Sequence, residues 1–350
     1  MKIVVAIDSF KGSASSRELN EEVKKAIVSI LPDAEVTTFE IADGGEGTIS
    51  AIKAGLGGVF VPVSTVDLMG NPITANYLIT SNIAIIEVAE VVGIDKITPS
   101  KETFQQASTY GLASLFKDAM EKGVKEIILT LGGTGTSDGG IGLLEGLGGD
   151  IDHLPSLNKV KITALADVNN VYAGPEGYAR VFGKQKGGTP DLINKIDEQA
   201  QDIVEKVRSK YDIDLQKIPG TGASGGLGGA VVLLGGTIES GFYKIAHLLN
   251  IESQIKTCDL IITGEGRMDH QTSNGKVPFG MAMMAKKHKI PIIAFCGAIG
   301  DDLGIIEELL LASYSIQKET LPLNEAMKKE KTLSNINRLT KNVIRTRFLS

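Results

Sequence analysis

The sequence predicts an α/β protein of two domains, and three observations support this class. Short apolar runs typical of buried strands alternate with stretches of helical periodicity, the pattern of a mostly parallel sheet covered by helices on both faces. Residues 57–89 break this alternation with three strand-like runs and no room for helices between them. The length of 350 residues exceeds what one hydrophobic core usually organises. We therefore expect two α/β architectures interleaved in one chain.

Ten strands are expected from the short apolar runs. They are Lys2–Ile7, Glu35–Ile41, Val59–Val63, Ile73–Ile79, Ile83–Val88, Glu126–Leu131, Lys161–Leu165, Asp259–Thr263, Pro291–Cys296 and Leu311–Ile316. Turn residues at Met69–Pro72 and Ser81–Asn82 separate the three runs within residues 57–89. Those three runs are therefore expected to pair as antiparallel hairpins.

Six helices are expected from apolar residues recurring with a period near 3.6. They are Ser16–Leu31, Thr103–Glu121, Pro190–Lys210, Ala223–Leu234, Lys276–His288 and Leu323–Leu349. Ser15 or Ser16 precedes Arg17-Glu18 and is a suitable N-cap. The last helix carries Leu333, Ile336, Leu339 and Val343 on one face, so we expect it to dock on a domain surface.

These elements predict how the two domains divide the chain. Residues 1–62 and 255–350 are expected to form a flavodoxin-like domain with a parallel sheet. Residues 63–254 are expected to form a mixed α/β domain, inserted into the first and containing the antiparallel hairpins.

Composition excludes several classes of function. The net charge is −6 with no basic block, aromatic residues make up 5% and tryptophan is absent, so nucleic acids and anionic membranes are poor partners. No apolar stretch approaches the roughly 20 residues that span a bilayer, and the run MKIVVAI is too short for a signal peptide. Cys258 and Cys296 lie beside strand-like runs and are expected to be reduced core thiols. We expect a cytoplasmic protein that acts on a small molecule.

Four loops rich in glycine and carboxylates each follow a strand-like run directly. They are Asp8–Ser13, Ala42–Thr48, Gly132–Gly140 and Gly264–Asp269. Ligands of open α/β sheets bind beyond the carboxyl ends of the strands, and glycine lets backbone N–H groups approach an anion closely. Carboxylates at such loops suit a hard cation such as Mg²⁺. With one lysine and one arginine, these are the parts that phosphoryl transfer needs.

The charged residues of these loops are the strongest site candidates. Asp43 and Glu46 flank a glycine pair, and Glu265 and Asp269 lie on either side of Arg267. A surface carboxylate is usually solvated, but glycines directly after a buried strand would hold these in a crevice. Lys276 stands where a helix is expected to begin, and a cation there opposes the helix dipole, which indicates a bound anion nearby.

Two other nucleotide-binding patterns are weak or absent. Gly220–Gly225 matches GxGxxG, but the polar residues 212–219 before it are no buried strand, which argues against a nicotinamide-linked dehydrogenase of hydroxy acids. Backbone donors at Gly222 and Gly225 remain candidates for holding an anion. The sequence contains no GxxxxGK[ST], HRD or DFG, so it is neither a P-loop enzyme nor a protein kinase.

Five stretches together resemble the bacterial glycerate kinases of the first type. They are Asp8–Ser13, Ala42–Thr48, Gly132–Gly140, Pro219–Gly228 and Ile262–Asp269. They occur in that family's order and at its usual spacing over essentially the whole chain. The resemblance implies ATP-dependent phosphorylation of D-glycerate, with the active site in the cleft between the two α/β domains. It favours 2-phosphoglycerate as the product, with 3-phosphoglycerate as the alternative.

The chain departs from the family pattern in three places. The segment Ala166–Asn170 lacks the proline that usually follows it, and Lys184 replaces a proline in the family's Phe-Gly-Pro-Gln-Lys-Gly block. Ser137 stands where the family has asparagine, and a hydroxyl donates one hydrogen bond where an amide donates two. We expect these changes to affect loop rigidity and substrate affinity more than the class of reaction.

The resemblance and the loop chemistry together give each candidate an expected role. The backbone of Ser137–Gly140 and the side chain of Lys11 would contact phosphates, Asp167 or Asp269 would accept the hydroxyl proton, and Arg267 would grip the glycerate carboxylate. The expected catalytic residues are Asp43, Asp167, Arg267 and Asp269. The expected Mg²⁺ ligands are Asp43, Glu46 and Glu265. The expected ATP-binding residues are Asp8, Ser9, Lys11, Gly132, Gly133, Thr134, Ser137, Asp138, Gly139, Gly222, Gly225 and Lys276.

A second class of function stays open at this point: a protein that binds a sugar acid in a glycine-lined cleft without turning it over. Four or more carboxylates near an anionic ligand favour the enzyme, because a binding protein has little use for them. The sequence gives no indication of the oligomeric state.

Overall fold

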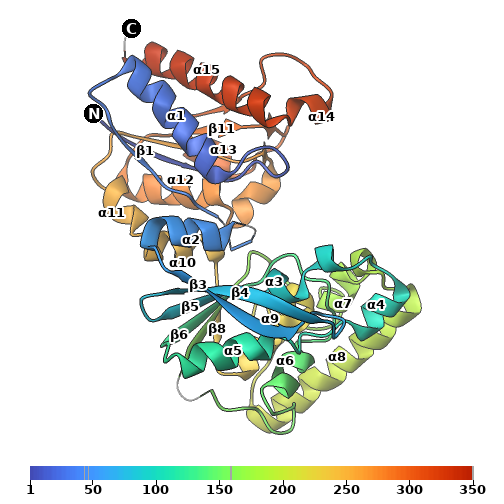
Figure 1. Ribbon diagram of the computed structural model, residues 1–350. Coiled ribbons are helices and arrows are strands. Elements are labelled where there is room, and N and C mark those ends of the chain that lie inside the picture. The colour runs from blue at the N-terminus through green and yellow to red at the C-terminus, as the bar shows by residue number, and fades with distance from the viewer. Residues whose placement is uncertain (43, 46, 158–159, 349–350) are drawn as a thin grey trace. The chain divides into compact units, whose positions relative to one another are not determined.

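The computed structural model describes residues 1–42, 44–45, 47–157 and 160–348, and the chain divides into two compact units (Figure 1). Unit 1 comprises Met1–Asp43, Ser50–Leu56 and Phe242–Ser350, and unit 2 comprises Gly44–Ile49 and Gly57–Gly241. The units change over at residues 56 and 241, where the sequence suggested 62 and 254. The difference arises because the strand that begins at Val59 pairs within the sheet of unit 2, and the helices after residue 241 pack into the core of unit 1.

Unit 1 contains a five-stranded sheet, all parallel, in the order β13-β11-β9-β1-β2. Its strands are β1 (Lys2–Ile7), β2 (Glu35–Thr38), β9 (Leu260–Gly264), β11 (Ile292–Cys296) and β13 (Ala312–Ser315). Numbered by their own sequence in the unit, the strands follow the order 2-1-3-4-5, which is the flavodoxin-like arrangement. In the sequence, unit 2 lies entirely between β2 and β9, and residues 50–56, which belong to unit 1, interrupt it. The expected interrupted flavodoxin-like domain is confirmed.

Helices cover both faces of this sheet (Figure 1). They are α1 (Ser16–Ile30), α2 (Thr48–Leu56, whose first two residues group with unit 2), α10 (Gly241–Leu248), α11 (Ile251–Ile255), α12 (Val277–His288), α13 (Ile306–Leu309), α14 (Leu323–Ala326) and α15 (Lys329–Phe348). Strand β1 shows why both faces are covered. Ile3 and Val5 pack into one apolar cluster with α1 and α15, while Val4 and Ala6 pack into another with α12. A strand with both faces buried reads as a continuous apolar run.

Unit 2 contains a six-stranded mixed sheet in the order β3-β4-β5-β6-β7-β8. Its strands are β3 (Val59–Val66), β4 (Pro72–Thr80), β5 (Ile83–Glu87), β6 (Glu126–Thr130), β7 (Lys161–Leu165) and β8 (Thr237–Glu239). The first three pair antiparallel, as expected, and β5 to β8 pair parallel. The sequence did not predict β8, which has only three residues.

The helices of unit 2 differ from the expectation in one important place. They are α3 (Ala89–Val92), α4 (Lys101–Gln106), α5 (Leu112–Glu121), α6 (Ile141–Gly146), α7 (Tyr178–Phe182), α8 (Pro190–Tyr211) and α9 (Ala223–Leu233). The expected helix Thr103–Glu121 is wrong, because two helices, α4 and α5, occupy that stretch. Thr109 is held by the Asp138 carboxylate, and a side chain at Gly111 would collide with the Val66 carbonyl, so tertiary contacts break the helix there.

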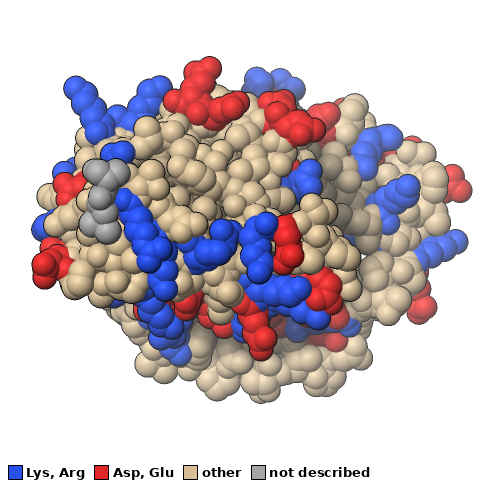
Figure 2. All heavy atoms as spheres, turned by 90° about the horizontal axis from the view of Figure 1, so that it is seen from above, with Lys and Arg blue, Asp and Glu red and all other residues tan. Residues whose placement is uncertain are grey.

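The C-terminal helix docks as its apolar face predicts. Helix α15 packs on α1, with Ile336 fully buried and Leu333, Leu339 and Val343 partly buried in the same cluster. Figure 2 shows acidic and basic side chains intermingled over the visible face. Within the described ranges, none of the helices combines the length and apolar character needed to cross a bilayer.

Candidate active site

The loops after β1 and β9 lie side by side in unit 1. These two strands are neighbours at the point where the strand order reverses, which is where open α/β sheets form a ligand-binding crevice. The backbone N–H of Asp8 donates to the carbonyl of Gly264, with 2.9 Å between nitrogen and oxygen. The fold thus brings the Asp8–Ser13 loop to the Gly264–Asp269 loop, as the glycine–carboxylate pattern predicted.

The loop after β1 is held by its own backbone. The Asp8 carboxylate accepts a hydrogen bond from the Ser9 N–H, and Phe10 bridges to Ala14 across a tight turn. Lys11 lies exposed in this turn. The loop therefore fixes the backbone around Asp8 and Ser9 and presents a lysine on a short, ordered turn.

Among the described residues of the unit 1 loops, Glu265 is the most buried charged residue, with 6% of its surface exposed. The Thr272 hydroxyl donates to one of its carboxylate oxygens, and Lys276 Nζ lies 3.4 Å from the other. Burial raises the pKa of Glu265, while the hydrogen bond from Thr272 and the charge of Lys276 act in the opposite direction. Lys276 occupies the N-cap position of α12, where a cation opposes the helix dipole. The buried Glu265 carboxylate supplies the negative charge beside it.

Arg267 and Asp269 form an exposed pair beyond Glu265. Arg267 Nε lies 3.3 Å from Asp269 Oδ2, and 71% of the arginine side chain is exposed. Asp269 also accepts from the Gln271 N–H and caps the short 3₁₀ helix His270–Asn274. Burial raises the pKa of Asp269, but the hydrogen bonds from Gln271 and Arg267 outweigh it and the pKa lies below its ordinary value. Asp269 is thus a poor proton acceptor.

A second group of candidates gathers at the carboxyl ends of β6 and β7 in unit 2. Gly132 follows β6, and a Cβ placed on it would lie 3.4 Å from the Cα of Gly45. Gly44 lies against Leu165, the last residue of β7, and Asp167 follows two residues later. Asp43 and Glu46 lie outside the described residues. The structure therefore brings Gly132 and the end of β7, which Asp167 follows, to the glycine pair at residues 44–45.

Asp138 serves the loop in which it lies. Its carboxylate accepts hydrogen bonds from the backbone and hydroxyl of Thr109 and from the N–H groups of Gly140 and Gly142, at 2.7–3.2 Å. Four donors on one carboxylate leave little capacity for a ligand. Asp138 fixes the loop between β6 and α6, whatever that loop binds.

Gly222 and Gly225 are required by close packing of the chain on itself. A Cβ on Gly222 would collide with the Val171 carbonyl, and one on Gly225 would collide with the Thr136 carbonyl. Gly225 also has a positive φ of 67°, and its carbonyl accepts from the Gly139 N–H at 2.9 Å. The segment Gly220–Gly225 thus packs against the loop between β6 and α6, and this packing alone explains Gly222 and Gly225.

Two residues of the site were missed by sequence reasoning. Thr272 donates to Glu265 and accepts from the Asp269 N–H, so it ties the two carboxylate positions together. Lys186 is buried and donates to the Thr136 carbonyl at 2.6 Å. The sequence showed Lys186 only as part of a short polar block that resembles a family motif. No local sequence pattern predicts that the side chain of Thr272 or Lys186 is buried.

Comparisons with known proteins decide the family. The model of the Glycerate kinase family matches residues 3–153 and 150–347. The chain belongs to the glycerate kinase family. A relative named Glycerate 2-kinase from Escherichia coli (strain K12) is 33% identical, over 99% of this chain and 98% of the relative. A Glycerate kinase from Halalkalibacterium halodurans is also 33% identical, over 95% of this chain and 94% of the relative.

A solved structure supports the same conclusion. A crystal structure from Salmonella typhimurium LT2, assigned as a glycerate kinase 2, matches with a TM-score of 0.85 at 31% identity, over 99% of this chain and 98% of the other. The expected fold class is confirmed, and so is the expected enzyme class, a phosphotransferase. Membership of a kinase family implies the use of ATP. The alternative of a binding protein without turnover is not supported.

Glu265 is the described residue that best fits a ligand of Mg²⁺. No group of three histidine, cysteine, aspartate or glutamate side chains that could hold a metal occurs among the residues that the structure describes. Mg²⁺ does not need such a group, because it is usually held by one or two carboxylates together with substrate phosphates. Glu265 fits this use, since a buried carboxylate with a raised pKa gains from a nearby cation.

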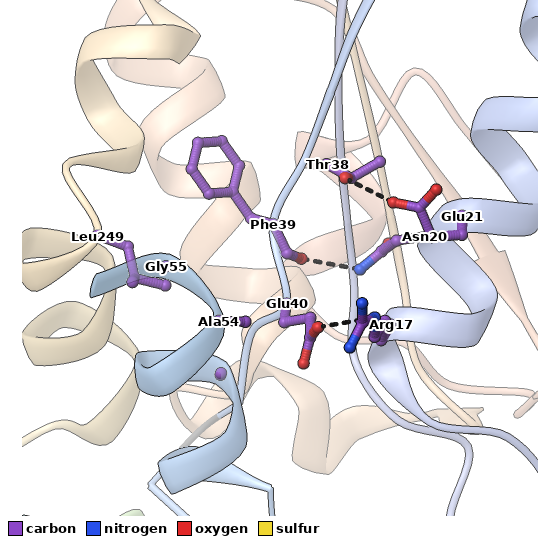
Figure 3. A pocket seen from close by; sticks show the side chains of 10 residues that line it. Arg17, Asn20, Glu21, Thr38, Phe39, Glu40, Ala54, Gly55 and Leu249 are labelled. Atoms are coloured by element: carbon purple, nitrogen blue, oxygen red, sulfur yellow. Dashed lines mark hydrogen bonds and ion pairs between the residues drawn. The ribbon is translucent and has the colours of Figure 1, made fainter. Parts of the chain in front are cut away.

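A further pocket in unit 1 lies between α1, β2 and α2 (Figure 3). Its volume is about 270 Å³, and its polar side chains form hydrogen bonds or ion pairs with other residues of its lining. Arg17 lies 3.5 Å from Glu40, Thr38 donates to Glu21, and Asn20 donates to the Phe39 carbonyl. Among the predicted site residues that the structure describes, none lines this pocket, so we assign it no part in the reaction.

Proposed function

We propose that the protein transfers the γ-phosphoryl group of ATP to the 2-hydroxyl of D-glycerate and releases 2-phosphoglycerate. The observation that carries this proposal is the match to a relative named Glycerate 2-kinase over nearly the full length of both chains. The site geometry supports it, because the glycine–carboxylate loops of unit 1 meet at the strand-order reversal where such folds bind ligands.

In unit 1, we assign the substrate carboxylate to Arg267. Its Nε is engaged by Asp269, which holds the guanidinium in place, and the exposed outer nitrogens remain for a bidentate contact. Asp269 has a lowered pKa and two hydrogen bonds of its own. Of the two expected proton acceptors, Asp167 in unit 2 is therefore the better candidate.

The phosphates of ATP are assigned to Lys11 and to the backbone of Ser137–Gly140. Asp43, Glu46 and Glu265 are the residues that would hold Mg²⁺, and the ion would neutralise the negative charge that develops during transfer. The buried Glu265 would anchor that cation from the protein side. The protein itself contributes position and charge, since phosphoryl transfer needs little covalent chemistry from the enzyme.

We propose that the residues of both units serve this one reaction. The family model matches residues 3–153 and 150–347, which together extend through both units, so neither unit is a domain appended to the family's sequence. Variants in each unit should therefore affect the same turnover.

An ATP-dependent assay with D-glycerate tests the proposed function. ADP release is followed by a coupled enzyme system, and the position of the phosphate in the product is identified by phosphorus NMR. ADP release that depends on D-glycerate, with phosphate on the 2-hydroxyl, is the expected result. Phosphate on the 3-hydroxyl would overturn the regiochemistry, and binding of D-glycerate without ADP release would overturn the enzyme activity.

A further inference from the structure

Lys186 is a buried lysine, and none of the described carboxylates forms an ion pair with it. It ends the short 3₁₀ helix Lys184–Lys186, and only 3% of its surface is exposed, whereas Lys184 in the same helix is exposed. Its ammonium group donates to the Thr136 carbonyl at 2.6 Å and lies 3.4 Å from the Thr134 hydroxyl. Both partners are neutral, and within the part of the chain that the structure describes no carboxylate lies within ion-pair distance of Lys186.

A buried ammonium with neutral partners is costly, because charges taken out of water are normally paired. Burial accordingly lowers the pKa of Lys186 to about 8, although the nearby carboxylate of Asp138 acts in the opposite direction. That carboxylate is already engaged by four donors from Thr109, Gly140 and Gly142. Lys186 thus brings a positive charge to the loop between β6 and α6, and no carboxylate among the described residues of unit 2 forms an ion pair with it.

The loop between β6 and α6, whose Thr136 carbonyl accepts from Lys186, also contains two buried hydroxyl groups. Thr136 is fully buried and Ser137 is 2% exposed. Among the described residues, neither side-chain oxygen has a hydrogen-bond partner. More than about 90% of buried polar groups in proteins have one, so two adjacent exceptions beside a buried ammonium indicate a group that the loop is built to receive.

We propose that Lys186, with the hydroxyls of Thr136 and Ser137, forms a binding site for a phosphate group of the nucleotide. The inference rests on the proposed function for the identity of the ligand as ATP or ADP. A phosphate group offers only acceptor oxygens and negative charge, which matches one ammonium and two hydroxyl donors. The lysine supplies the counter-charge, and the ligand removes the cost of burying it.

Calorimetric titration with ADP tests this site. Lys186→Met removes the ammonium and keeps an apolar chain of similar length, and Lys184→Met is the matched control on the exposed side of the same helix. Loss of a charge-assisted hydrogen bond should weaken ADP binding about 10- to 100-fold in Lys186→Met, while Lys184→Met should change it less than about 2-fold. Binding of D-glycerate, titrated separately, should be unchanged in both. An unchanged affinity for ADP, or a loss confined to D-glycerate, would overturn the proposal.

Proton uptake gives a second measurement that needs no variant. At pH 8 about half of the Lys186 amines are neutral before binding, so ADP should bind with uptake of about half a proton. Titrations in two buffers of different ionisation enthalpy measure this number from about pH 7 to about pH 9, and the absence of uptake by the wild-type protein throughout that range would refute the site even if Lys186→Met does not fold. Normal ADP binding by Lys186→Met beside normal turnover of D-glycerate by the wild type overturns this inference alone. Weakened ADP binding by the variant, with no turnover by the wild type, overturns only the proposed function.

Discussion

Replacing Arg267 with lysine separates a substrate-binding role from a structural one. The structural role is the pair with Asp269, in which Nε lies 3.3 Å from Oδ2 and the arginine side chain is 71% exposed. An exposed ion pair contributes about 0–1 kcal/mol to stability, and lysine can keep part of that. If the pair is the whole role, activity should stay near normal and the melting temperature should fall by no more than about 2–4 °C.

The substrate-binding role predicts the opposite pattern. Lysine keeps the charge but loses the planar fork that matches a carboxylate. Losing one charged hydrogen bond in the transition state costs roughly 1.5–3 kcal/mol, or about 10- to 150-fold in kcat/KM for D-glycerate. The KM for ATP should change little, because the contact is with the acceptor substrate.

The assay is ADP release at varied D-glycerate, with thermal denaturation on the same samples. Arg17→Lys is a matched control, since Arg17 is another exposed arginine of unit 1, 75% exposed and 3.5 Å from Glu40. It should leave kcat/KM for D-glycerate unchanged. The reasoning is refuted if Arg267→Lys shows nearly normal kcat/KM for D-glycerate, whatever the change in its melting temperature.

Four further outcomes are expected. Chelation of divalent cations by EDTA should abolish ADP release and added Mg²⁺ should restore it, so full turnover in metal-free buffer would contradict the metal assignment. Asp167→Asn should lower kcat about 100-fold or more if Asp167 accepts the hydroxyl proton, and a normal kcat in the same assay would exclude that role. Asp138→Ala should destabilise unit 2 by about 2–4 kcal/mol because its four donors lose their acceptor, so unchanged thermal denaturation would show that the loop is held in another way. Glu265→Gln should lower activity without lowering the melting temperature at pH 8.

Much of the fold could be predicted because the strands are short apolar runs with a regular spacing. Both faces of β1 are buried, so its sequence is continuously apolar and its bounds are clear. The break between α4 and α5 could not be predicted, because it depends on Asp138, which is distant in sequence and holds Thr109. Helical periodicity predicts which residues face a core. It does not predict a hydrogen bond from a distant side chain that ends the helix.

The site could be predicted to the level of its loops but not of its side chains. Asp8 and Gly264 meet because the topology of a parallel sheet brings the carboxyl ends of neighbouring strands to one edge. The use made of each charge depends on tertiary contacts. Asp138 resembles a ligand-binding carboxylate in the sequence and supports the loop in the structure, whereas Lys186 lies in a polar block and proves to be buried.

The buried charge of Glu265 is unfavourable for folding, so its removal should not lower the melting temperature at pH 8. Burial raises its pKa above the ordinary value of 4.5, and Thr272 and Lys276 offset that only in part. A raised pKa means that folding favours the protonated form, so this contribution to stability is complete below pH 4.5 and is lost as the pH rises through the raised pKa. At pH 8 the wild-type protein has therefore lost it, while the neutral side chain of the Glu265→Gln variant does not titrate. The melting temperature of the variant should equal or exceed that of the wild type at pH 8, and the difference should move in favour of the wild type as the pH falls toward 4.5. A variant that is less stable by the same amount at both pH values would show that the carboxylate of Glu265 stabilises the fold, and that no function is needed to explain its burial.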